Sequence, residues 1–139
     1  MDKFFFVEID NLVEADLGDA SEKKLYGTME PWVNGEPLVA LRTEKLPQKH
    51  NEAAQYVVFT KDALYFFDFA VEPARVIKVK CFAQKAVIAH AFMLGNGENE
   101  AQVRVMMDNE LKLKFGLAGG AAADSLLQKI AACPFFAPQ

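Results

Sequence analysis

Cysteine and histidine, the residues that most often bind zinc, are scarce in this sequence, with two of each among 139 residues. Cys81 and Cys133 form no closely spaced pair, and we expect two free thiols that pack as small apolar side chains. His50 and His90 lack cysteine or carboxylate partners at the spacing of a zinc site. A nucleophilic pair of Cys81 and His90 would lack a third residue to orient it. The sequence therefore predicts no metal, no cofactor and no enzymatic activity.

An excess of positive charge and long apolar runs are also absent. The 15 lysines and arginines are outnumbered by 19 aspartates and glutamates, whereas a nucleic-acid-binding protein needs a basic face. No segment approaches the roughly 20 consecutive apolar residues that cross a membrane, and the first ten residues do not resemble a signal peptide. We therefore expect a cytoplasmic protein without a transmembrane segment and without a nucleic-acid partner.

The acidic side chains concentrate at the N-terminus. Residues 1–22 contain seven acidic side chains and one basic one, and the rest of the chain has a slight basic excess. This segment either keeps the protein soluble or lies across a mildly basic face of the body. The length suits one domain. We divide it into an acidic N-terminal extension, residues 1–32, and a main body, residues 33–133.

The extension contains apolar residues at helical spacing, Phe6, Ile9, Val13 and Leu17. This spacing predicts an amphipathic helix that ends near Gly18, although the run 4–7 also fits a strand. Ser21 then offers an N-cap for a short second helix.

From residue 37 onward, runs rich in β-branched and aromatic residues predict seven strands. The final segment, residues 121–132, has apolar side chains at helical spacing and ends before a proline, which predicts a helix. Consecutive antiparallel strands must curl or close to protect their edges, and an amphipathic helix can close one end of a small barrel. The predicted strands are residues 37–44, 55–60, 63–69, 72–82, 86–94, 101–107 and 110–117.

The order of these segments resembles that of bacterial pleckstrin-homology (PH)-like families. The similarity rests on Gly35-Glu36 before the first strand, on "VVFTKDALYFFD" at 57–68 and on "ELKLKF" at 110–115. It implies a mainly β (α+β) fold, a split barrel of about seven antiparallel strands capped by a C-terminal helix, here with an N-terminal helical extension. Bacterial relatives form closed rings, so the resemblance also implies a homo-oligomer.

PH domains that bind phosphoinositides carry bases on the first two strands and the loop between them. The matching segment contains Arg42, Lys45, Lys49 and His50, with Glu44 among them. An ordinary solvated loop is the favoured interpretation. Because the solvated loop is favoured, we expect little binding to membrane surfaces. Binding of an anion or lipid headgroup by this loop is the alternative.

Basic side chains also alternate with apolar ones along the later strands. They either keep a sheet face soluble or form a patch for an acidic protein partner. These bases are Lys78, Lys80, Arg104, Lys112 and Lys114.

Aromatic residues mark both ends of the chain, namely Phe4, Phe5, Phe6, Phe135 and Phe136. They either complete the core or pack against a second subunit. Taken together, these features predict a non-enzymatic binding or assembly module that self-associates and binds a protein or peptide. The alternative is a lipid or small-molecule binder that uses the barrel mouth or a basic sheet face.

Overall fold

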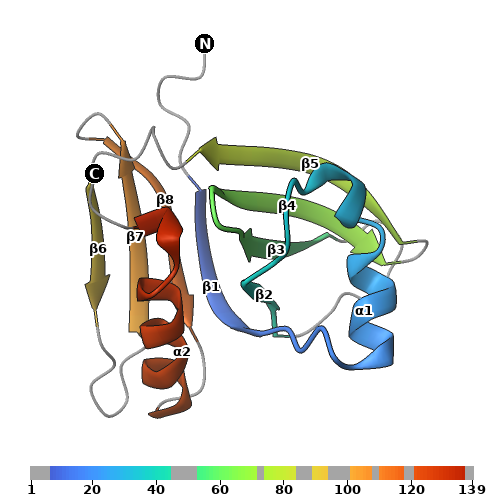
Figure 1. The fold of residues 1–139 in the computed structure, drawn as a ribbon, viewed down its shortest axis with the longest axis horizontal. Coiled ribbons are helices and arrows are strands. Elements are labelled where there is room, and N and C mark those ends of the chain that lie inside the picture. Colours follow the sequence, from blue (N-terminus) through green and yellow to red (C-terminus); the bar gives the residue numbers. More distant parts are fainter. Residues whose placement is uncertain are drawn as a thin grey trace.

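One curved sheet of eight strands organises the described part of the chain (Figure 1). Across the sheet the strands follow the order β5-β4-β3-β2-β1-β8-β7-β6. The strands are β1 (Val7–Glu14), β2 (Val39–Thr43), β3 (Ala54–Phe59), β4 (Ala63–Val71), β5 (Ala74–Ala83), β6 (Ala89–Met93), β7 (Ala101–Met107) and β8 (Glu110–Leu117).

In the described residues, two α-helices, α1 (Ala20–Tyr26) and α2 (Ala121–Ala131), and two short 3-10 helices, η1 (Glu30–Trp32) and η3 (Pro134–Phe136), accompany the sheet. The computed structural model describes residues 7–44, 53–71, 74–83, 89–93, 101–107, 110–117 and 121–136. The predicted β-rich body and C-terminal helix are confirmed. The seven predicted strands correspond to β2–β8, and their ends differ by only a few residues.

The predicted N-terminal helix over residues 6–17 is wrong, because residues 7–14 form the strand β1. β1 lies between the two halves of the molecule, antiparallel to β2 and parallel to β8 (Figure 1). Both neighbouring strands can therefore bond its backbone groups, which outweighs the helical spacing of a few apolar side chains. The second predicted helix exists as α1, but its N-cap is Asp19 rather than Ser21.

The β3–β4 hairpin turns at a buried threonine. The backbone N–H of Thr60 donates to the carbonyl of Ala63 at 2.9 Å, and the Ala63 N–H donates to Thr60 Oγ1 at 3.2 Å. Lys61 and Asp62 at the tip are exposed. Gly35 approaches the same corner with a φ of +107°, a left-handed conformation that favours glycine.

The middle strands of one half of the sheet, β3 and β4, are buried on both faces. Their inner face contributes Val57 and Phe59 to a core that includes residues of β7, β8 and α2. Their outer face contributes Tyr56 and Val58 to a second core with Tyr26 and other residues of the segment that carries α1 and η1. The sequence of a strand with both faces buried is a continuous apolar run. This explains why residues 56–59 are all apolar.

Candidate functional site

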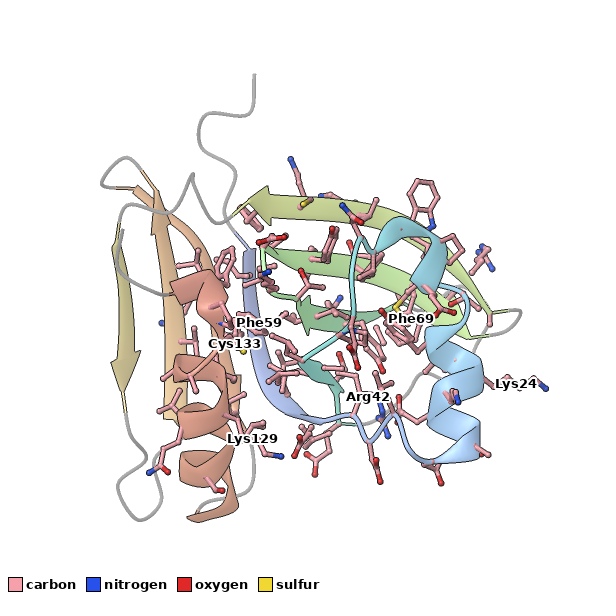
Figure 2. All side chains as sticks on the ribbon, viewed as in Figure 1. Lys24, Arg42, Phe59, Phe69, Lys129 and Cys133 are labelled. Atoms are coloured by element: carbon pink, nitrogen blue, oxygen red, sulfur yellow. The ribbon has the colours of Figure 1, made fainter. Side chains whose placement is uncertain are left out.

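A cleft of about 460 Å³ lies where the C-terminal part of α2 faces the junction of β1 and β2. Its walls are residues 14–17, residues 37–40 and Lys129. An adjoining cavity of about 300 Å³ is lined by residues 38–39, Lys129 and residues 132–134. The two cavities share Leu38, Val39 and Lys129, so we treat them as one groove and call it the seam cleft. In Figure 2, Lys129 and Cys133 lie on the part of the chain that borders it.

The strand pairing creates the cleft. The backbone N–H of Ala15 donates to the carbonyl of Ala40 at 2.8 Å, after which β1 turns away toward α1. Beyond this rung lie Val39, the first residue of β2, and Leu38 before it, which is held on the β3 side by a hydrogen bond from the Leu38 N–H to the carbonyl of Phe59 at 2.7 Å. Since β1 has left, the side chain of Leu38 is 50% exposed, and Leu38 is one of three exposed large apolar residues in the described part of the chain, with Trp32 and Ile77.

Acidic groups outnumber basic ones in the seam cleft. Lys129 Nζ lies 2.9 Å from Glu14 Oε2, and both side chains are largely exposed to solvent. Asp16 is exposed, and its Oδ1 accepts a hydrogen bond from the Gly18 N–H at 2.9 Å. Among the described residues of the lining, the charged side chains are thus two carboxylates and one ammonium, and the ammonium already faces one of the carboxylates.

The apolar end of the seam cleft includes a cysteine. Cys133 is buried, its Sγ donates to the carbonyl of Lys129 at 3.5 Å, and burial raises the pKa of its thiol to about 11. The thiol is therefore protonated at neutral pH and serves as part of an apolar wall rather than as a nucleophile. Cys81 was expected to be buried as well, but it is exposed on β5, which is an edge strand of the sheet in the described part of the chain.

A polar row crosses the inner face at the ends of β2 and β3. Thr43 Oγ1 accepts from the Gln55 N–H at 3.0 Å, and Gln55 Nε2 donates to Asp68 Oδ1 at 3.1 Å. Lys78 stands opposite Asp68 on β5. These positions flank the β2–β3 connection, where phosphoinositide-binding PH domains carry bases. Here Thr43 and Gln55 are neutral, and they hydrogen-bond to each other and to the carboxylate of Asp68.

The outer face carries a largely buried ion pair. Arg42 Nε donates to Glu22 Oε1 at 2.9 Å, and the hydroxyl of Tyr56 donates to Glu22 Oε2 at 3.2 Å, so α1 is tied to β2 and β3. Arg42 Nη1 also donates to the carbonyls of Thr43 and Glu44. Among the bases of the predicted anion-binding loop, Arg42 is thus held within the fold, and Lys45, Lys49 and His50 lie outside the described residues.

The bases of the later strands are divided between two faces of the sheet. Lys80 stands opposite Phe66 of the inner core, and Lys78 stands opposite Asp68, so both belong to the inner face. Lys114 alternates with the core residues of β8 and belongs to the outer face. The register places Arg104 opposite Lys114 and Lys112 in the irregular part of β8, although the side chains of both lie outside the description. The structure does not bring these five bases together.

The terminal aromatics have different positions. Phe135 is 1% exposed, and its ring lies edge-on to that of Phe59 with a centroid distance of 6.0 Å, so it belongs to the inner core. Phe136 lies in η3, but its side chain is not described, and Phe4, Phe5 and Phe6 precede the described residues.

Sequence reasoning missed the seam cleft and the Glu22–Arg42 pair. The exposed Leu38 after a proline was the only local sign of the cleft.

The described residues contain neither a candidate membrane-spanning helix nor a candidate metal site. No helix there is long and apolar enough to cross a membrane. No group of three or more histidine, cysteine, aspartate or glutamate side chains in those residues is arranged to hold a metal ion. His90 lies on β6, and its side chain is outside the description.

The curled sheet with a C-terminal helix across it defines a PH-like fold. A solved structure that shares it is that of a DUF1696 family protein with a pleckstrin-homology domain from Shewanella loihica PV-4. The two align with a TM-score of 0.55 and 16% sequence identity, over 90% of this chain and 98% of the other. At this identity the likeness shows the fold alone. No protein-family model and no curated protein matches the sequence.

Proposed function

We propose that this protein is a non-enzymatic PH-like module that binds a short segment of a partner protein in the seam cleft. The observation that carries the proposal is the cleft itself, where the half-exposed Leu38 stands beside a length of chain that β1 has left. Extended peptides bind where main-chain groups and side-chain pockets lie next to each other, because the first provide affinity and the second provide specificity. The two free cysteines support the cytoplasmic location that we also propose.

A small apolar molecule fits the seam cleft less well. The larger cavity has charged residues on two walls, and burying an apolar ligand there would leave these side chains without water or partners. A peptide can satisfy them with its own polar groups while one side chain fills the apolar end beside Cys133 and Pro134.

Binding of a lipid headgroup is the alternative function. It would use the polar row and the adjoining β2–β3 connection. Thr43 and Gln55 provide no positive charge there, and Asp68 places a carboxylate in the same row. A phosphorylated headgroup needs several fixed cations, so these residues disfavour it.

Selection from a phage-displayed library of random short peptides tests the proposal. Wild-type protein and a Leu38→Asp variant would be immobilised in parallel. We expect enriched peptides on the wild type and at least about a tenfold loss of their affinity on Leu38→Asp, since burying a carboxylate beside an apolar side chain is costly.

Ile77→Asp is the matched control, because Ile77 is 53% exposed on β5 and lies outside the seam cleft. Its peptide affinities should equal those of the wild type. Failure to enrich any peptide, or equal binding by Leu38→Asp, would contradict the proposed function.

A further inference from the structure

We infer that the ligand of the seam cleft is a basic-apolar peptide, in which a lysine or arginine lies next to an apolar residue, and that Lys129 occupies the site of the ligand's base when the cleft is free. The inference rests on the proposed function and names the class of partner. It follows from the charges of the cleft, from the place of its apolar end and from the direction of the strands.

The charge distribution favours a cationic ligand. Glu14 and Asp16 lie on the β1 wall, and Lys129, the one cation among the described lining residues, comes from the opposite wall. The Lys129–Glu14 pair is exposed, and exposed pairs of this kind are weak because water screens them. An ammonium or guanidinium on the ligand can therefore replace Lys129 at Glu14, while Asp16 adds attraction that no lysine of the lining offsets.

The apolar end of the seam cleft lies directly beside this acidic wall. Leu38, Val39 and Lys129 line both cavities, so one ligand residue can contact Leu38 and Pro134 while its neighbour faces Glu14. Cys133 adds an uncharged thiol to this end. A peptide with an acidic residue next to the apolar one would instead place its carboxylate against two carboxylates.

The backbone indicates how such a peptide would lie. β1 runs antiparallel to β2 and ends its pairing at the rung between Ala15 and Ala40. A peptide that enters the cleft along this line would lie beside Leu38 and Val39, close to Glu14 and Asp16.

The test is a parallel selection from the same library of random peptides on the wild type, Lys129→Ala and Asp16→Lys. We expect peptides enriched in lysine or arginine beside apolar residues on the wild type. The enrichment should be stronger on Lys129→Ala, where Glu14 is released, and should shift toward acidic peptides on Asp16→Lys.

Fluorescence anisotropy with the most enriched synthetic peptide gives the magnitude. At low salt, Lys129→Ala should bind about threefold tighter and Asp16→Lys at least about threefold weaker than the wild type, as expected for exposed charge pairs. Lys61→Ala is the control, because Lys61 is an exposed lysine at the β3–β4 corner, and it should change nothing.

The outcomes separate this inference from the proposed function. Acidic or uncharged enriched peptides, or weaker or equal binding by Lys129→Ala, would overturn the basic-apolar class, while loss of binding in Leu38→Asp would still support peptide binding. If no peptide is enriched, or if Leu38→Asp binds as well as the wild type, both conclusions fail together.

Discussion

At the scale of single residues, two tyrosines beneath α1 differ in one hydrogen bond. Tyr26 and Tyr56 are both buried in the outer core, with ring centroids 6.2 Å apart. The hydroxyl of Tyr56 donates to Glu22, whereas the hydroxyl of Tyr26 is buried and has no hydrogen-bond partner among the described residues. A buried hydroxyl without a hydrogen bond lowers the free energy of unfolding, whereas a hydroxyl that is hydrogen-bonded to a carboxylate raises it.

Replacing each tyrosine by phenylalanine should therefore have opposite effects. We expect Tyr26→Phe to be neutral or to stabilise the protein by up to about 1 kcal/mol, and Tyr56→Phe to destabilise it by about 1–3 kcal/mol. Urea unfolding monitored by circular dichroism measures both. Equal destabilisation by the two variants would show that the hydroxyl of Tyr26 has a partner after all.

The same tyrosines predict a loss of stability in alkali. Burial, followed by the nearby Glu30 and Tyr65, raises the pKa of Tyr26 from 10.0 to about 12. Burial and Glu22 also raise the pKa of Tyr56 well above its usual range. The unfolded chain loses these protons at a lower pH than the folded protein, so the stability is intact below about pH 10 and falls as the pH rises above it, by about 1.4 kcal/mol per pH unit for each tyrosine.

Urea unfolding at a series of pH values would measure this decrease, and absorbance of the tyrosinate ion would report the titration. Tyr26→Phe should reduce the slope of stability against pH, because one of the two groups is gone. The pKa of Tyr26 is 10.0 in the unfolded chain and about 12 in the folded protein. A free energy of unfolding that stays constant between these two pH values would contradict the burial of its hydroxyl.

At the scale of elements, α1 is held by the sheet rather than by its own stability. It has seven residues, whereas isolated helices need roughly 12–15 to be even marginally stable. The fixed points are the Glu22–Arg42 pair, the buried Tyr26 and, just after the helix, Met29, which is 0% exposed. The segment that carries α1 and η1 therefore forms a layer that covers the outer face of the sheet.

Met29→Ala should destabilise the protein by about 2–4 kcal/mol, because it leaves a cavity in the outer core. Trp32→Ala is the control within the same segment. Trp32 is 56% exposed, so its loss should change the unfolding free energy by less than about 0.5 kcal/mol. Thermal unfolding of the two variants gives the comparison, and a larger effect of Trp32→Ala would mean that the layer is held from its exposed side.

The edges of the sheet also belong to this scale. In the described part of the chain β5 is one edge strand, and its pairing with β4 is interrupted by a bulge beside Asp68. Lys78 follows this bulge, and lysines and bulges on an edge both hinder pairing with a second sheet. For this reason we placed the proposed partner at the seam cleft and not at this edge.

At the scale of the whole molecule, the distribution of charge predicts the response to lipid. We expect no sedimentation with vesicles that contain phosphatidylinositol phosphates beyond that with phosphatidylcholine alone, at physiological salt. The polar row offers Thr43, Gln55 and Asp68 where a headgroup would need bases. Salt-sensitive binding that is lost in the double variant Lys45→Glu, Lys49→Glu would favour the lipid alternative instead.

Self-association is the second prediction at this scale. We expect analytical ultracentrifugation to give a mass above the 15.4 kDa of one chain. Replacing Phe4, Phe5 and Phe6 by serine should lower that mass if these side chains pack against a second subunit. Phe135 is unsuitable for the test because it belongs to the inner core. A single species of 15.4 kDa would contradict self-association.

The sequence by itself determined the seven strands β2–β8, the helix α2 and the corner at Thr60, because alternation, turn residues and helical spacing act over a few neighbouring residues. It did not determine β1. The apolar residues there fit a helix or a strand equally, and only pairing with both β2 and β8 selects the strand.

The tertiary structure alone decided which side chains meet. Glu14 and Lys129 are 115 residues apart in the sequence, yet they face each other across the seam cleft. Arg42, which the sequence offered for an anion, is bonded instead to Glu22, and the five bases of the later strands belong to different faces. Such contacts depend on strand order and register, which no local pattern encodes, and the walls of the candidate site meet only through them.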